Sequence, residues 1–178
     1  MSEPRRVMVD IETLGLERGA AIVSIGAVRF NTNGINGSFG RSVSLSSCQD
    51  AGLTIDAETI EWWFSQDDAP REQIAGGVEL VDALSAFTAW YGDVDEIWAN
   101  SPSFDCELLE AAYEAVGLEE PWDFWEERDV RTIASLPVAP DIEQEGTEHD
   151  AIDDARHQAH VVGKALDAID SDPAEVAR

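Results

Sequence analysis

Basic residues are scarce in this chain: its 178 residues include eleven lysines and arginines against 37 aspartates and glutamates. Lys164 is the single lysine, and the formal net charge is −26. The chain therefore lacks the basic surface that is typical of nucleic-acid-binding proteins. Repulsion on this scale opposes folding in dilute buffer and is screened at molar salt, where the Debye length is about 3 Å. We interpret the composition as halophilic rather than disordered, because acidic and apolar residues alternate at regular spacing.

Cysteines and long apolar runs are also few. Cys48 and Cys106 cannot form a disulfide framework and lack the spacing of a zinc site. No apolar run approaches the roughly 18 residues that a membrane helix needs. No apolar signal region follows the short basic start at residues 1–6. These absences predict a cytoplasmic protein with no membrane partner.

Apolar periodicity predicts a single α/β domain over residues 1–170, followed by a polar tail at 171–178. Strands are expected over four segments: 6–11, 21–30, 35–45 and 96–100. Helices are expected over 56–66, after Gly77 as far as Tyr91, over 104–116 and over 152–169. Turn residues at 31–34 join the second and third strands, so the first three strands should form an antiparallel meander. This order predicts a mixed sheet flanked by helices.

Two acidic residues end the first predicted strand. Asp10 and Glu12 stand two positions apart, so their side chains point to the same side of the strand. In so acidic a chain, such a pair could equally be two solvated surface residues. The apolar residues before them, and Ile11 between them, favour a functional site.

Three further polar residues are candidates for the same site. Asp105 starts the helix after the fourth strand, where it could instead be an ordinary helix-terminal acid. His149 and Asp154 lie at the start of the last helix, beside its apolar stripe. His157 and His160 are spaced to chelate a transition metal, but no cysteine or third histidine is near them, and we interpret them as solvated or lightly packed.

Four acidic residues and a histidine fit phosphodiester cleavage. Two carboxylates about 4 Å apart repel by roughly 4 kcal/mol at an effective dielectric near 20, so gathering four of them implies bound cations. Mg²⁺ prefers oxygen ligands, and two such ions about 4 Å apart stabilise an in-line displacement. A histidine serves as general base because its ordinary pKa lies near neutral pH.

The motifs that carry these residues resemble a known superfamily. The runs VDIETLG, SFD and HDAIDDA resemble, in order and spacing, the three exonuclease motifs of the DEDDh 3′→5′ exonucleases. The runs TIEWWFSQ, EEPWDFWEERDVRT and DDARHQA are similar to the branch that contains exonuclease VIII and phage exonuclease A, and more distantly mycobacterial RNase AS. The resemblance covers roughly residues 7–166.

The resemblance implies a ribonuclease H-like fold and a role for each polar residue. Asp10, Glu12 and Asp154 would bind a first Mg²⁺, and Asp10 would bridge to a second ion that Asp105 helps to hold. Mn²⁺ should substitute for Mg²⁺. His149 would take a proton from the attacking water.

The same resemblance places other residues near the substrate. Thr13 and Leu14 fall where family members contact the terminal nucleotide. Trp62 or Trp63 could stack on a base, or both could pack in the core. Arg128 and Arg131 could bind phosphate, or could neutralise neighbouring acids.

The function predicted from the sequence is 3′→5′ exonuclease activity on a nucleic-acid 3′ end. DNA is favoured over RNA, because the similarity to exonuclease VIII is the closer one. A non-catalytic module that binds nucleic acid or a replication partner is the alternative from another class. Dimers among branch relatives raise the prospect of a homodimer.

Overall fold

Five strands form one mixed sheet in the order β3-β2-β1-β4-β5. The computed structural model describes residues 3–66, 74 and 76–171. The strands are β1 (Arg6–Thr13), β2 (Ile22–Asn31), β3 (Gly34–Ser42), β4 (Glu96–Ala99) and β5 (Glu127–Asp129). The first three form the predicted antiparallel meander, and β4 and β5 extend the sheet in parallel from β1.

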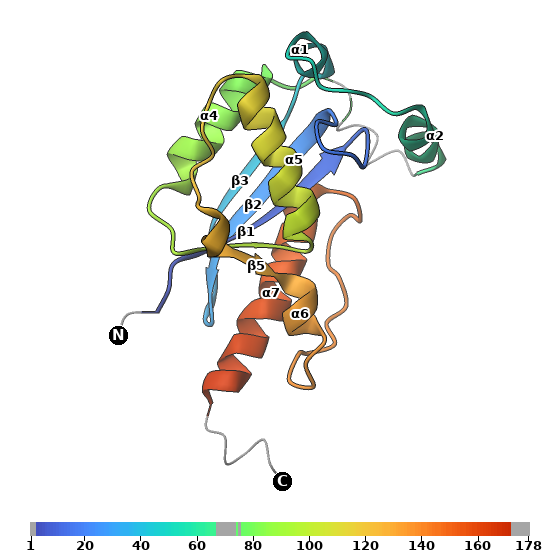
Figure 1. Cartoon of the computed structure of the whole chain (residues 1–178). Coiled ribbons are helices and arrows are strands. Elements are labelled where there is room, and N and C mark those ends of the chain that lie inside the picture. The colour runs from blue at the N-terminus through green and yellow to red at the C-terminus, as the bar shows by residue number, and fades with distance from the viewer. Residues whose placement is uncertain (1–2, 67–73, 75, 172–178) are drawn as a thin grey trace.

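Helices cover both faces of the sheet, as Figure 1 shows. On one face lie α4 (Leu80–Tyr91) and α5 (Pro102–Ala115), which share a large apolar core with β1 and β2. On the other face lie α6 (Val130–Ala134) and the long α7 (Ala151–Asp170). The short α1 (Leu45–Asp50) and α2 (Ala57–Ser65) lie near the end of the sheet where β1 finishes. The mixed sheet flanked by helices is therefore confirmed.

The side chains of β1 alternate between the two faces of the sheet, and carboxylates end one of these two rows. Val7, Val9 and Ile11 are buried in the core beneath α4 and α5. Met8 belongs to the smaller core beneath α7. Because side chains alternate across a strand, Asp10 continues the Met8 face, where carboxylates replace apolar residues at the end of the strand.

Two parts of the secondary structure differ from the sequence prediction. The third strand stops at Ser42 instead of continuing to residue 45, because the Ser44 side chain caps α1 and accepts a hydrogen bond from the Ser47 N–H. The 3₁₀ turn η1 (Phe124–Glu126), β5 and α6 were not anticipated. The predicted cap of α2 is confirmed, since Asp56 Oδ1 accepts a hydrogen bond from the Thr59 N–H at 2.8 Å.

The predicted C-terminal tail falls largely on residues that the structure does not describe. Most of the predicted polar tail, at 172–178, lies outside the described residues. Among the helices that the structure describes, none has the length and apolar character required to cross a bilayer.

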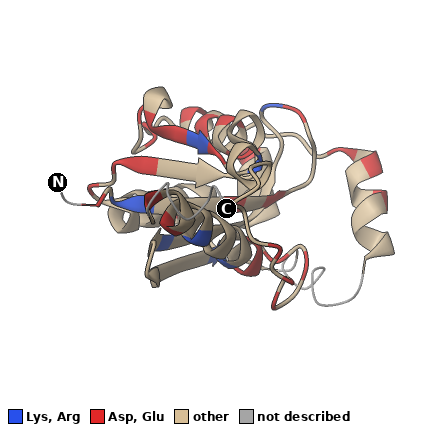
Figure 2. Cartoon of the chain, turned by 90° about the horizontal axis from the view of Figure 1, so that it is seen from below, with Lys and Arg blue, Asp and Glu red and all other residues tan. Residues whose placement is uncertain are grey.

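Acidic residues lie on most elements and in several loops, and basic residues are few (Figure 2).

A glycine lets α7 approach the sheet at its functional end. Gly26 on β2 pairs with Asp10 on β1. A Cβ atom at position 26 would lie 2.2 Å from the backbone carbon of Ala151, in the first turn of α7. The close contact between Gly26 and this turn therefore sets the distance between α7 and Asp10.

Gly26→Ala should destabilise the protein, because the methyl group would displace the first turn of α7. Overpacking of this kind costs about 1–3 kcal/mol. Gly40→Ala on β3 is the matched control, since a Cβ there would meet nothing within 4 Å. Chemical denaturation in high KCl measures both variants, and equal stabilities for the two would contradict the close contact.

Candidate active site

A cavity of about 450 Å³ lies where β1 ends, between the start of α5 and the start of α7. Its polar lining brings together side chains from three distant parts of the sequence: Asp10, Glu12, Asn100, Ser101, Asp105, Gln144, Glu148, His149, Asp154, His157 and Gln158. All five residues that the sequence indicated as catalytic are among them. The cavity therefore assembles the predicted set, although the strand and helices that supply it are far apart in sequence.

The acidic side chains reach the cavity from rigid elements. Asp10 and Glu12 project from β1. Asp105 lies in the first turn of α5, where its Oδ2 accepts a hydrogen bond from the Ser101 N–H at 3.2 Å. Glu12 and Asp105 are buried. Burial of Glu12 and Asp105, together with the backbone hydrogen bond to Asp105, thus restricts these two carboxylates before any ligand arrives.

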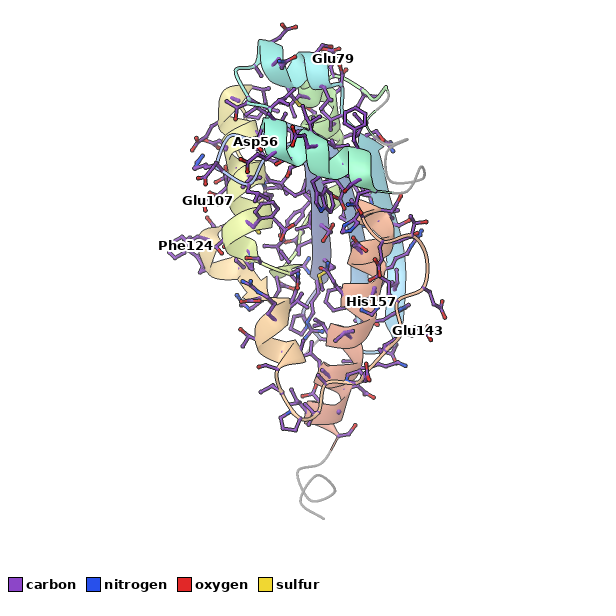
Figure 3. The ribbon with its side chains drawn as sticks, turned by 90° about the vertical axis from the view of Figure 1, so that its right-hand side faces the viewer. Asp56, Glu79, Glu107, Phe124, Glu143 and His157 are labelled. Carbon is purple, nitrogen blue, oxygen red and sulfur yellow. The ribbon has the colours of Figure 1, made fainter. Side chains whose placement is uncertain are left out.

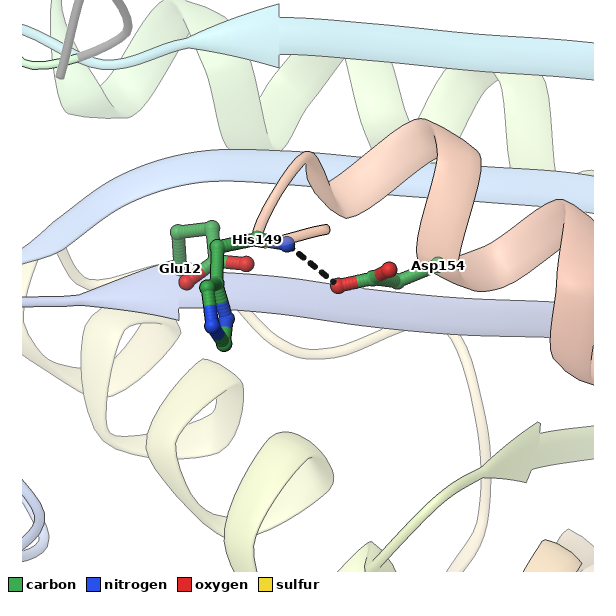
Figure 4. A group of neighbouring side chains, drawn as sticks. All are labelled: Glu12, His149 and Asp154. Atoms are coloured by element: carbon green, nitrogen blue, oxygen red, sulfur yellow. Dashed lines mark hydrogen bonds between the residues drawn. The ribbon is translucent and has the colours of Figure 1, made fainter. Parts of the chain in front are cut away.

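His149 and Asp154 come from the loop before α7 and from its first turn. The His149 N–H donates to Asp154 Oδ2 at 3.2 Å, as the dashed line in Figure 4 marks. His149 has a left-handed backbone with φ of 61°, a conformation that is uncommon for residues other than glycine. Glu12, His149 and Asp154 each offer one ligand atom, and these atoms lie within 4.8 Å of one another.

Two glutamines that the sequence did not single out hold the carboxylates. Gln158 on α7 donates from Nε2 to Asp10 Oδ1 at 2.8 Å. Gln144 in the preceding loop donates to Asp154. Gln158 stands four positions after Asp154, and this helical spacing places both side chains on one face. That spacing was the available signal, but it is shared by many glutamines on exposed helix faces.

The electrostatics of the cavity favour protonated or cation-bound carboxylates. Burial, and then repulsion from Asp105 and Glu12, raises the pKa of Asp10 well above its ordinary value. Burial, followed by repulsion from Asp154 and Asp105, raises the pKa of Glu12 to about 8. Burial also raises the pKa of Asp105 and of Asp154.

A divalent cation fits this cavity. The donors are carboxylate oxygens, which are the ligands that Mg²⁺ prefers, and positive charge among them would relieve the repulsion. The Gln158 Oε1 atom is buried and has no hydrogen-bond partner among the described residues. A hydrated cation beside Asp10 would supply the missing donor.

The residues predicted to contact the terminal nucleotide are mostly buried. Leu14 is 3% exposed and Trp63 is 2% exposed, and the two pack together with Val23. Trp63 Nε1 donates to the Thr13 carbonyl oxygen at 2.9 Å, and the Thr13 hydroxyl donates to the Gly15 carbonyl. Base stacking by Trp63 and insertion of Leu14 beside the terminal base are therefore disfavoured. Both side chains instead pack against the end of β1.

The two arginines differ in their access to the site. Arg131 donates to the Ser101 hydroxyl oxygen at 2.9 Å, and its positive charge opposes the rise in the pKa of Asp105. Arg128 instead donates to the Trp125 carbonyl and lies 3.7 Å from Glu96. Arg131 is therefore the better placed of the two to meet a phosphate near the cavity.

The histidine pair on α7 points mainly into a second cavity. His157 lines the acidic cavity and also, with His160 and Glu143, a neighbouring cavity of about 500 Å³. Figure 3 shows His157 on α7 beside the loop that carries Glu143. Within the described part of the chain, the group of three or more residues with metal-ligand spacing is that of Glu12, His149 and Asp154. The structure thus favours the acidic cluster over the histidine pair as the metal centre.

Comparison with known proteins identifies a matching family and a related protein. The model of the 3′–5′ exoribonuclease Rv2179c-like domain matches residues 5–166. An exodeoxyribonuclease of Enterobacteria phage T4 is 26% identical over 166 residues, which covers 76% of this chain and 73% of the phage protein.

Solved structures share the fold at low sequence identity. The nuclease domain of 3′hExo, a DEDDh family member bound to rAMP, is 12% identical with a TM-score of 0.65, covering 93% of this chain and 92% of that one. Exonuclease X in complex with 5′ overhanging duplex DNA is 16% identical with a TM-score of 0.62, covering 96% and 95%. The fold is therefore the ribonuclease H-like fold of the DEDDh exonucleases.

Without divalent cations, the free energy of unfolding should fall as the pH rises from about 5 to about 8. The raised pKa of Glu12 means that the folded state binds a proton that the unfolded state has already released over this range. Each unit of pKa difference corresponds to about 1.4 kcal/mol, so the loss should reach a few kcal/mol. Denaturation at constant high KCl with a chelator measures it.

Glu12→Gln should flatten this dependence, because the amide does not titrate. Glu58→Gln, on the exposed face of α2, is the control and should leave the slope unchanged. A stability that is constant or rises over this pH range would show that the carboxylates do not repel one another as described.

Proposed function

The chain belongs to the Rv2179c-like 3′–5′ exoribonuclease domain family of DEDDh exonucleases, and we propose that Asp10, Glu12, Asp105, His149 and Asp154 form its catalytic centre. The observation that carries this proposal is their meeting in one cavity from three distant segments. Burial, and then repulsion from other members of the cluster, raises the pKa of Asp10 and of Glu12, which a purely solvated acidic surface would not do. A perturbed cluster of this kind in a cleft is typical of functional sites.

Asp10, Glu12 and Asp154 would hold a first Mg²⁺, with Asp10 and Asp105 holding a second, and Mn²⁺ would substitute. Bound there, the ions would supply electrophilic stabilisation of the attacking and leaving oxygens of a phosphodiester. The Gln158 and Gln144 amides keep Asp10 and Asp154 oriented toward the cavity.

His149 would act as the general base in the hydrolysis. In this step a ring nitrogen of His149 would take a proton from water as the water oxygen bonds to phosphorus. The bond from phosphorus to the 3′ oxygen breaks, and the released 3′ oxygen takes up a proton from solvent. The terminal nucleotide then leaves with a 5′ phosphate. The hydrogen bond from the His149 N–H to Asp154 supports this role, because it ties the base to a proposed metal ligand.

DNA is the substrate that we favour, and the phage T4 relative is named as an exodeoxyribonuclease. RNA is the second candidate, supported by the name of the matching family. In either case, Arg131 at the cavity edge would contact a phosphate, and Thr13 would present its backbone to the terminal nucleotide over the support of Leu14 and Trp63.

Degradation of end-labelled single- and double-stranded DNA and RNA, in high KCl with Mg²⁺ or Mn²⁺, tests this proposal. We expect mononucleotide release from the 3′ end, with a higher rate on DNA. His149→Ala should lower kcat by about 10²–10⁴-fold, the usual contribution of a general base. Asp10→Asn should lower kcat at least as much.

Asp50→Asn is the matched control for charge, because Asp50 is exposed at the end of α1. It should retain the activity of the unaltered protein. Release of nucleotides from the 5′ end, or full activity of Asp10→Asn, would overturn the proposed centre.

A further inference from the structure

Two adjacent tryptophans on α2 have separate environments. Trp63 is buried in the apolar cluster with Leu14, whereas Trp62 is 41% exposed. Consecutive residues on a helix point about 100° apart, so one tryptophan faces the core while the other faces the groove. Core packing accounts for Trp63 and leaves Trp62 to be explained.

The Trp62 ring contacts the imidazole of His149. The two ring centroids lie 4.8 Å apart, with an angle of 82° between the ring planes. This is the edge-to-face arrangement that aromatic pairs prefer. The contact joins α2 to the end of a loop, residues 135–150, that has no helix or strand.

The segment that carries His149 holds its backbone. Its backbone is left-handed, and its N–H is bound to Asp154 Oδ2. These features act on the backbone, whereas the Trp62 ring contacts the imidazole itself. A ring packed against the imidazole from α2 restricts rotation about the His149 side-chain bonds.

Trp62 also lines a second cavity, of about 370 Å³, next to the catalytic one. The two cavities share Ile11, Glu12 and Phe104, so they form neighbouring parts of one groove. A substrate base that enters the second cavity would therefore touch the same indole that touches His149.

We propose that Trp62 is a positioning residue that aligns His149 and couples filling of the second cavity to the alignment of the general base. This inference rests on the proposed function, in which His149 takes the proton from water. A base against the exposed part of the indole restricts its rotamers, and the restricted indole restricts the imidazole. Misplacement of a reacting group by about 1 Å can cost 10²-fold in rate, so alignment should appear in kcat.

Trp62→Leu and Trp62→Phe test the role of the ring, with kcat and KM measured on a single-stranded oligonucleotide with Mn²⁺. We expect Trp62→Leu to lower kcat at least tenfold, with a smaller change in KM. Trp62→Phe keeps an aromatic edge and should retain kcat within about threefold. Phe64→Leu is the matched control, since Phe64 lies on the same helix, is 72% exposed and lines a different cavity.

A double-mutant cycle with His149→Ala decides whether Trp62 acts through His149. If it does, adding Trp62→Leu to His149→Ala should change kcat by less than twofold, because the group that it positions is already gone. The rise in melting temperature on adding Mn²⁺ should be the same in Trp62→Leu and in the unaltered protein, since Trp62 is not a proposed ligand.

The outcomes separate this inference from the proposed function. If His149→Ala keeps full activity, the proposed base is wrong, and the inference falls with it. If His149→Ala is impaired while Trp62→Leu lowers kcat additively, changes only KM or loses the Mn²⁺ response, the base stands and the positioning role of Trp62 is wrong.

Discussion

Repulsion among buried carboxylates is the constraint to which the rest of the site responds. Asp10, Glu12, Asp105 and Asp154 line one cavity, and burial raises the pKa of each. Repulsion from other members of the cluster raises the pKa of Asp10 and of Glu12 further. Such a cluster opposes folding unless protons or cations neutralise it. The two glutamine amides and the charge of Arg131 relieve only part of this cost. Divalent cations would relieve the rest, so the same cluster that weakens the metal-free protein would bind the cofactor of an exonuclease.

The fold holds the cluster by three contacts that carry no charge. The alternation of β1 turns Asp10 toward α7, and Gly26 lets the first turn of α7 approach the sheet beside it. Trp63 packs beneath the end of β1 and binds the Thr13 carbonyl. Trp62 then contacts His149 from the neighbouring position on α2. A preorganised site of this kind needs little rearrangement when the substrate arrives.

Long, periodic elements were predictable from the sequence, and short ones were not. The meander, α4 and α7 follow from apolar spacing, and the cap of α2 follows from Asp56. β5 has three residues and α6 has five, too few for a period to emerge. Asp10 and Glu12 were recognisable by their strand spacing, but Asp105 could not be told from a helix-capping acid without knowing which strands are neighbours. Gln144 and Gln158 act through contacts between segments, and those appear only in the folded chain.

The most direct test of the account is anomalous diffraction from crystals soaked in Mn²⁺. The account predicts two manganese peaks in the cavity, about 4 Å apart, with carboxylate oxygens of Asp10, Glu12, Asp105 and Asp154 as ligands. Well-diffracting crystals with no manganese among these four side chains, or with manganese bound at His157 and His160 instead, would contradict it.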